Sequence, residues 1–244
     1  MRLNRLLLTF LLAASFGHAP AFAADGEAPK PKVFVVSTLY KKHETTPSYD
    51  LPTLRALIER LDPDVFVLDV TPTELRERTV WPGKVEYVQV VFPMIDARGA
   101  TAYASEPAEP LFAELSGPST AAHVALEKER PAVRAALRDL DAATYAALAV
   151  HWRTPEAVHD ALTDRVVGAN RDLKNRLVGP VAETNQRRWN EHHAQRLLEA
   201  AARHPGQRIV MLVGIESRYE VMRLLADASG IELVDVADWP AAAP

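Results

Sequence analysis

The chain of 244 residues contains no cysteine. This absence excludes disulfide bonds, thiol chemistry, cysteine-based zinc sites and lipid-modified cysteines. Exported proteins often rely on disulfides, so an exported chain of this composition must be held together by packing alone. Hydrophobic residues make up 48% of the sequence, which is ample material for a core.

Several signatures of catalysis are also missing. The sequence has no Gly-x-Ser-x-Gly elbow, no Gly-x-Gly-x-x-Gly loop, no Walker loop and no His-Glu-x-x-His motif. Cofactor-dependent redox chemistry and phosphoryl transfer by those routes are therefore set aside. The formal charge is only −4 and basic residues are interspersed with acidic ones, so there is no basic stripe of the kind that nucleic-acid binding requires.

The first residues have the pattern of a secretory signal peptide. Arg2 and Arg5 give a positive start, residues 6–16 form an apolar stretch, and Ala21-Phe22-Ala23 is a small-residue cleavage site. An apolar stretch of about 11 residues is too short to span a bilayer comfortably. We therefore expect cleavage of residues 1–23 and export to the periplasm or the medium.

No later segment approaches the length of a membrane span, so we expect a soluble mature protein without a transmembrane segment. Residues 24–32 predict a short flexible leader. Residues 33–244 are long enough for a single α/β domain.

Short apolar runs near both ends of the chain predict buried strands. Residues 33–36, 65–70 and 209–213 are rich in β-branched residues and apolar on both faces, which is typical of a parallel sheet covered by helices. Asp50 can cap a helix that ends near Leu61, between the first two strands. Strand, helix and strand then form a βαβ unit with parallel pairing. The predicted fold class is α/β.

The middle of the chain predicts a helical insertion. Residues 119–180 are rich in alanine, with helix breaks expected at Pro131, around Asp141 and at Pro155. Before it, residues 88–92 fit either a strand or a helical turn, and residues 100–104 fit a short strand.

After the insertion, a helix over residues 182–204 feeds the strand that ends at Gly214. Ser217 can cap the next helix, which reaches about Ala228, and residues 231–236 close the domain with another strand.

Ligands of open α/β sheets bind beyond the carboxyl ends of the strands. A helix that feeds a parallel strand starts near that same edge, so the start of the 182–204 helix should face it too. The polar residues that we expect to converge there are Ser37, Thr38, Tyr40, Asp69, Asn185, Arg187, Arg188, Gly214, Glu216 and Ser217.

Asp69 is the most suggestive of these residues. A carboxylate at the end of a buried strand is costly unless it is paired, and Arg187 or Arg188 can pair with it. Asp69 then either contacts a ligand or metal, acts as a general base, or merely caps the next turn.

The segment from Gly214 to Ser217 either presents backbone N–H groups to an anion or makes an ordinary strand-to-helix turn, and the second interpretation is slightly favoured.

Three further residues, His43, His193 and Glu106, are candidates for the site. His43 could join Glu44 and Glu216 around a metal, but their spacing fits no established motif, so solvated loop residues are the favoured interpretation. His193 shares a helical stripe with Trp189, which favours a packing role.

Glu106 could close a further strand end and join the site. The sequence identifies no metal and no cofactor, and both stay unknown.

The order of the motifs resembles the TraB/PrgY, Tiki and ChaN-like superfamily, which is distantly related to the erythromycin esterases. The motifs, in order, are Ser37-Thr38-Leu39-Tyr40 after a strand, Asp69 at a strand end, Thr184-Asn185-Gln186-Arg187 opening a helix, and Gly214-Ile215-Glu216-Ser217 after a strand. In that family the first and last motifs read Gly-x-x-His, the second strand ends in Glu, and the helix opens with Arg-Asn or a similar pair.

This chain departs from the family pattern at its most reactive positions. Tyr40 and Ser217 stand where the family has histidines, Ser37 replaces the first glycine, and Asp69 replaces the glutamate. Members of the family include a metal-dependent protease, a haem-binding lipoprotein and an esterase. The resemblance implies the fold and the location of the site; without both histidines it does not favour metal-dependent peptide hydrolysis.

Three functions are compatible with these residues and motifs. The favoured one is a non-catalytic protein with a remodelled site that binds a small molecule or an envelope protein. The alternative is a hydrolase-like enzyme for an ester or peptide, with Asp69 as base or ligand, Glu216 as second carboxylate, Tyr40 as proton donor, and Asn185 and Arg187 contacting the substrate. The third is an envelope protein whose helical middle makes the relevant contacts.

Overall fold

A computed structural model describes residues 28–236, 238 and 239. The predicted signal peptide, residues 1–23, and the start of the predicted leader lie outside the described residues. Five parallel strands form one sheet in the order β3-β2-β4-β1-β5. The strands are β1 (Lys32–Thr38), β2 (Val65–Leu68), β3 (Thr101–Ala104), β4 (Arg208–Gly214) and β5 (Glu232–Leu233). The predicted α/β class with a parallel sheet is therefore confirmed.

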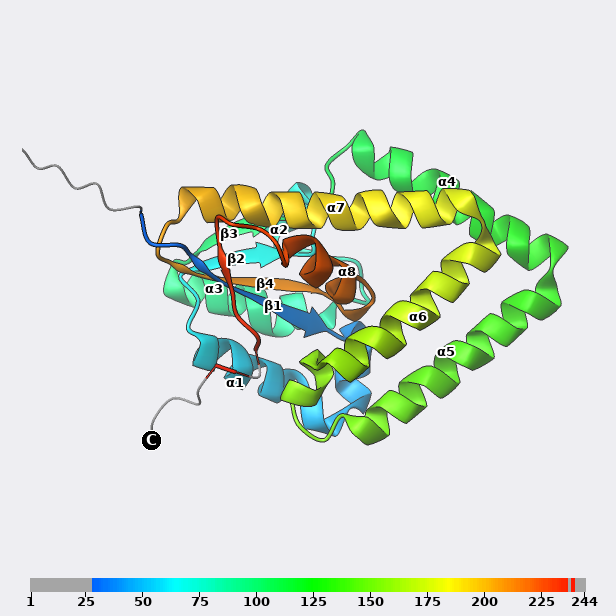
Figure 1. Cartoon of the computed structure of the whole chain (residues 1–244), viewed down its shortest axis with the longest axis horizontal. Coiled ribbons are helices and arrows are strands. Elements are labelled where there is room, and N and C mark those ends of the chain that lie inside the picture. The colour runs from blue at the N-terminus through cyan, green and yellow to red at the C-terminus, as the bar shows by residue number, and fades with distance from the viewer. Residues whose placement is uncertain (1–27, 237, 240–244) are drawn as a thin grey trace, which may run out of the picture.

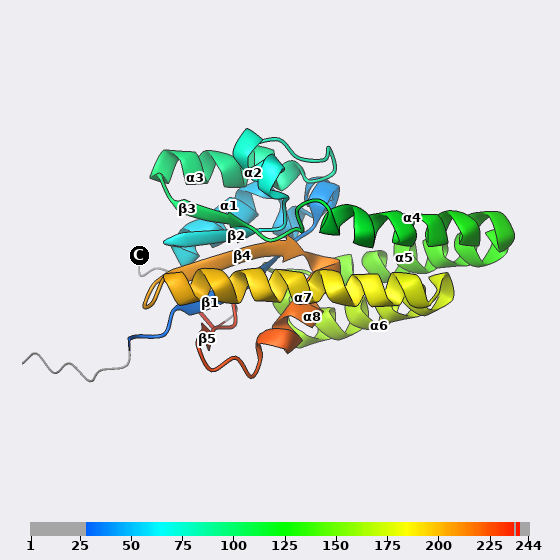
Figure 2. The same cartoon turned by 90° about the horizontal axis from the view of Figure 1, so that it is seen from above.

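Both faces of the sheet are covered by helices, because successive strand residues point to opposite faces. Phe34 and Val36 pack with α1 (Leu51–Leu61), the π-helical segment η3 (Tyr87–Val91) and α3 (Phe92–Arg98). Val33 and Val35 pack with α7 (Pro180–Arg203) and α8 (Ile215–Leu225) on the other face. Figures 1 and 2 show these two layers on either side of the strands.

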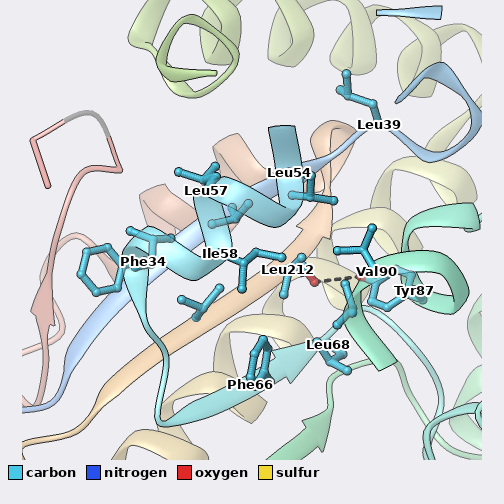
Figure 3. Packing of buried hydrophobic residues seen from close by; sticks show 14 of the residues in the cluster. Phe34, Leu39, Leu54, Leu57, Ile58, Phe66, Leu68, Tyr87, Val90 and Leu212 are labelled. Carbon is cyan, nitrogen blue, oxygen red and sulfur yellow. Dashed lines mark hydrogen bonds between the residues drawn. The ribbon is translucent and has the colours of Figure 1, made fainter. Parts of the chain in front are cut away.

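Helix α1 illustrates how the sequence sets this packing. The Asp50 carboxylate accepts a hydrogen bond from the Thr53 backbone N–H at 2.9 Å and caps the helix. One face of α1 then buries leucine and isoleucine side chains, including Leu54 and Ile58, against the sheet (Figure 3). Full burial of each such side chain contributes about 1.5–3 kcal/mol. The helix ends where Asp62 turns into the left-handed region with a φ of 46°.

A set of long helices extends beyond the carboxyl edge of the sheet (Figures 1 and 2). We call it the helical arm; it comprises α4 (Leu111–Glu129), α5 (Pro131–His151), α6 (Ala161–Val178) and the first half of α7. The predicted break around Asp141 is wrong, because α5 runs through it without interruption. Asp141 instead accepts hydrogen bonds from Asn170 and Lys174 of α6, which suits a helix interior. The arm also starts at Leu111, earlier than predicted, with Pro118 inside α4.

Other segments refine the predicted boundaries. Residues 88–92 are helical rather than extended, whereas the predicted short strand at 100–104 is present as β3. The predicted strand over 231–236 pairs only as the two-residue β5, and α8 ends at Leu225 rather than near Ala228. The predicted serine cap is wrong, because α8 starts at Ile215 with Gly214 at its N-cap.

Four short elements complete the chain: η1 (Tyr40–Thr45), η2 (Pro47–Tyr49), α2 (Pro72–Glu77) and η4 (Glu156–His159). Among the described residues, no helix combines the length and the apolar character that crossing a membrane needs.

Candidate functional site

A polar cleft of about 180 Å³ opens at the carboxyl edge of the sheet. It lies where β1, β2 and β4 end side by side, because these strands are neighbours in the sheet. The residues that line it are Tyr40, Asp69, Glu106, Arg171, Gln186, Trp189, Gly214, Glu216 and Ser217. Tyr40, Asp69, Gly214, Glu216 and Ser217 belong to the set expected from the sequence, so the structure brings these five together.

Asp69 forms the floor of the cleft and is almost fully bonded within the protein. Its Oδ2 accepts the Tyr40 hydroxyl at 2.9 Å and the Gly214 backbone N–H at 3.1 Å. Its Oδ1 lies 3.6 Å from Lys84 Nζ and 3.4 Å from His193 Nε2. Asp69 does not cap the next turn; that role belongs to Thr71, which forms a capping box with Glu74 at the start of α2.

Lys84 joins Asp69 to Glu106 at this floor. Its Nζ donates to Glu106 Oε1 at 2.7 Å and to the Asp69 backbone carbonyl at 2.5 Å. The side chains of Lys84, Asp69 and Glu106 are only 9%, 5% and 11% exposed. The three form a nearly dry cluster of one cation and two carboxyl groups, which we call the floor cluster.

The surroundings of the floor cluster shift the pKa values of its two carboxyl groups in opposite directions. Burial raises the pKa of Asp69, but the charge of Lys84 and the hydrogen bonds with Glu106 and Tyr40 outweigh it, and the pKa ends well below its usual range. Burial and the neighbouring Asp69 charge raise the pKa of Glu106 to about 8. Burial lowers the pKa of Lys84, yet both carboxylates outweigh that effect and the net pKa is raised. At neutral pH, Asp69 is thus ionised and Glu106 largely protonated.

His193 supports the floor from α7. It is fully buried, its Nδ1 lies 2.8 Å from Ser105 Oγ, and the Ser105 hydroxyl donates to the Leu68 carbonyl at 2.9 Å. Burial lowers the pKa of His193 to about 4, so the ring is neutral at pH 7. The predicted packing role agrees with this environment, although nothing in the local sequence pattern indicates that Asp69 is its neighbour.

A third acidic side chain, Glu86, lies buried near the floor cluster. It has no exposed surface, and within the described part of the chain neither of its carboxylate oxygens has a hydrogen-bond partner. Burial raises its pKa to about 7, with a smaller contribution from the charge of Asp69. Such a group is costly to ionise in place, so Glu86 adds a second proton-holding carboxyl group below the cleft.

The approach of Tyr40 to Gly214 depends on the glycine. A Cβ added at Gly214 would lie 2.0 Å from the Tyr40 hydroxyl oxygen, so no other residue fits without displacing the ring. Tyr40 itself has a φ of 54°, in the left-handed region that tyrosine rarely adopts. This strained backbone aims the hydroxyl at Asp69, and strain of this kind is concentrated at functional sites.

The rim of the cleft comes from the helical arm and α8. Arg171 of α6 donates to Glu216 Oε2 at 2.6 Å and also to Gln186 Oε1 of α7. Lys174 bridges Glu216 Oε1 and Asp141 Oδ1, both at 3.1 Å. Burial raises the pKa of Glu216, but Arg171 and Lys174 outweigh it and the net pKa is lowered. The rim is thus a network of ion pairs that ties the arm to the sheet domain.

Two predicted partners of Asp69 lie elsewhere. Arg187 pairs with Glu191 at 3.5 Å along the exposed side of α7, and Arg188 lies 3.9 Å from Glu114. The prediction that either arginine neutralises Asp69 is wrong, because Lys84 takes that place.

Three other predicted residues are buried beside the cleft rather than lining it. Ser37 and Thr38 have no exposed surface. Asn185 donates to the Leu115 carbonyl at 3.0 Å and to Ser119 Oγ at 3.1 Å, on the side of α7 that faces α4.

The predicted solvated loop position of His43 is wrong. His43 is 1% exposed, its Nδ1 lies 2.7 Å from the Tyr49 carbonyl, and its Nε2 accepts the Leu39 backbone N–H at 3.0 Å. Both ring nitrogens are hydrogen-bonded to backbone groups, so neither is available to bind a metal ion. Across the part of the chain that the structure describes, no group of three or more His, Cys, Asp or Glu side chains is arranged to hold a metal ion.

The fold and the site define an α/β protein with a polar cleft at the carboxyl edge of a parallel sheet, lined in part by residues of the helical arm. Comparison of this chain with protein-family models, with curated proteins and with solved structures found no match.

Proposed function

We propose that the chain is an exported protein that binds a small, hydrogen-bonding ligand in the cleft, on a fold like that of the TraB/PrgY, Tiki and ChaN-like proteins. The single observation that carries the proposal is the state of Asp69. Its oxygens are occupied by Tyr40, Gly214 and Lys84, and its pKa is lowered. A carboxylate that is so strongly held is a poor general base but a rigid floor for a binding site.

The walls of the cleft suit such a ligand. Trp189 supplies an aromatic surface, while Gln186, Arg171 and Ser217 supply polar groups. Small-molecule sites combine apolar surface with a few fixed polar groups in this way. The signal peptide predicted for residues 1–23 favours a ligand outside the cytoplasm, either a free small molecule or a group on an envelope protein.

A thermal-shift screen with a library of sugars, amino acids, nucleosides and small carboxylic acids tests this proposal. A compound that raises the melting temperature should lose that effect in Gln186→Leu, because Gln186 lines the cleft. Gln195→Leu is the matched control, because Gln195 lies on the same helix but is exposed. If no compound binds, or if every hit binds both variants equally, the cleft is not the binding site.

A hydrolase-like enzyme is the second candidate, and Glu106 favours it. The Glu106 side chain lines the cleft, and its pKa of about 8 keeps it protonated at neutral pH, as a general acid must be. Under this proposal water attacks the carbonyl carbon of an ester or peptide, the bond to the leaving group breaks as Glu106 donates its proton to that group, and the proton released by the water returns to Glu106.

Glu106→Gln separates the two candidates. The amide keeps the shape of the side chain but cannot release a proton. An enzyme should lose at least a hundredfold in kcat on a p-nitrophenyl ester or a fluorogenic peptide, whereas a binding protein shows no turnover before or after the substitution.

A further inference from the structure

A second hollow adjoins the cleft inside the helical arm. It has a volume of about 100 Å³ and lies between α4, α6 and α7. Arg171, Gln186 and Trp189 line both the hollow and the cleft, so these three side chains are the shared wall between them. A ligand in the cleft therefore has to extend only past this wall to enter the hollow.

The chemistry of the hollow differs from that of the cleft. The cleft is lined by Asp69, Glu106 and Glu216, whereas the hollow has no acidic residue in its lining. It offers hydroxyl, amide, imidazole and guanidinium groups from Ser116, Ser119, His123, Arg171, Asn175, Asn185 and Gln186. Ser119, Asn185 and Gln186 already donate hydrogen bonds within the protein. The side chains of Ser116, His123 and Asn175 make no hydrogen bond within the described residues, so their donors are available to a ligand.

Three cationic side chains lie near His123 in the hollow. Burial lowers the pKa of His123, and the charges of Arg171, Arg134 and Lys174 lower it further. Within the described residues, Arg171 Nε has no hydrogen-bond acceptor, although the other guanidinium nitrogens reach Glu216 and Gln186. A cavity with an unmet guanidinium donor, hydroxyl groups and no carboxylate favours an anion.

We propose that the ligand of the cleft carries a negatively charged group, a carboxylate, phosphate or sulfate, and that this group binds in the hollow against Arg171, His123 and Ser116. The inference rests on the proposed function, because it names the class of ligand that the cleft takes. The body of the molecule hydrogen-bonds in the cleft, and its charged end passes the wall formed by Gln186 and Trp189.

Titration with inorganic phosphate and with acetate, followed by calorimetry at low ionic strength, tests the hollow directly. The two probes distinguish a tetrahedral from a planar anionic group. We expect binding of at least one of them, with the affinity reduced at least tenfold in His123→Glu, because the new carboxylate faces the anion. This variant leaves the pairing of Arg171 with Glu216 in place, and circular dichroism checks that it folds.

Ala121→Glu is the matched control, because it adds the same charge to an exposed position of α4. It should change the affinity less than twofold. Absence of binding by both probes, or equal loss in the two variants, overturns the proposal of an anion site.

The library screen distinguishes this inference from the proposed function. If only neutral compounds bind the cleft, and His123→Glu leaves them unaffected, the cleft binds ligands but the anionic class is wrong. If phosphate or acetate binds in the hollow while no library compound binds the cleft, the anion site stands and the proposed function fails.

Discussion

The floor and the rim of the cleft each hold a lysine between two carboxyl groups, but they differ in the surroundings of those groups. At the floor, Lys84 lies between Asp69 and Glu106, which are 5% and 11% exposed. At the rim, Lys174 lies between Asp141 and Glu216, which are 29% and 33% exposed. Water can therefore solvate the rim carboxylates if their partner leaves, but not those of the floor.

The comparison assigns different tasks to the two regions. The floor is fixed, because a charge that loses its partner there would remain buried without a counter-charge or water, which is strongly destabilising. The rim is more adjustable, because its carboxylates are partly exposed, so water can replace a contact of Arg171 or Lys174. A binding site benefits from both properties, since the floor sets the shape and the rim adapts to the ligand.

Lys84→Met should have the largest effect on stability. The substitution keeps the length of the side chain but removes the positive charge, so Asp69 and Glu106 lose their cation. Removal of one partner from a buried ion pair typically costs about 3–5 kcal/mol. Chemical denaturation at pH 7 measures this as a loss in the free energy of unfolding.

Lys41→Met is the control for Lys84→Met, because Lys41 is exposed. It should change the free energy of unfolding by less than about 0.5 kcal/mol. A loss below about 1 kcal/mol for Lys84→Met would show that the floor cluster is solvated, and the contrast between floor and rim would disappear.

Glu86→Gln should act in the opposite direction and depend on pH. Burial raises the pKa of Glu86 from 4.5 to about 7 in the folded protein. As the pH rises through 4.5, the unfolded chain loses its proton first, so this group lowers the stability progressively up to about pH 7. Glutamine stays neutral and avoids this loss. Relative to the parent chain, the variant should gain about 3 kcal/mol or less between pH 4 and pH 8.

Denaturation curves at several pH values check this expectation. The buried histidines, such as His193, titrate identically in both proteins and cancel in the difference. Equal pH profiles for the parent and Glu86→Gln would mean that Glu86 is ionised at no cost in the folded state.

The strand ends could be predicted from the sequence because the βαβ pattern fixes their direction. Parallel strands place their carboxyl ends at one edge, so Tyr40, Asp69 and Gly214 had to meet if the strands were neighbours. The pairing of β1 and β2 with β4 fulfils that condition. The continuous burial of these strands likewise follows from their apolar pattern.

The partners of these residues could not be predicted in the same way. Lys84 lies between Pro82-Gly83 and η3, in a segment without clear periodicity, and reaches Asp69 only through the tertiary fold. Arg171 lies on α6, and the apolar stripe of that helix does not predict which of its polar side chains lines the cleft. Both belong to long-range contacts that local pattern does not encode.

Helix phase explains why Arg187 and Arg188 were wrong partners. A helix turns by about 100° per residue, so Gln186, Trp189 and His193 share one side of α7. Gln186 and Trp189 line the cleft and His193 contacts Asp69. Arg187 and Arg188 are rotated away from that side. The sequence predicted that this helix faces the site. The apolar stripe through Trp189 and His193 indicates which side of the helix is buried, and Arg187 and Arg188 do not lie on that side.

Lys174→Met should have the smallest effect and so sharpens the contrast with Lys84→Met. Its side chain is 11% exposed, close to the 9% of Lys84, but its partners keep other contacts. Glu216 still accepts from Arg171 and Tyr145, and Asp141 still accepts from Asn170. We expect a loss of about 1 kcal/mol in the free energy of unfolding at low salt.

That loss should shrink in 1 M sodium chloride, because salt screens partly exposed charges. The loss for Lys84→Met should change little, because its carboxyl partners are inaccessible to ions. Equal losses for the two variants at both salt concentrations would contradict the distinction, since burial of the lysine alone would then decide the cost. If the two variants lose different amounts of unfolding free energy, and only the loss for Lys174→Met depends on salt, then the exposure of the carboxylates decides the cost.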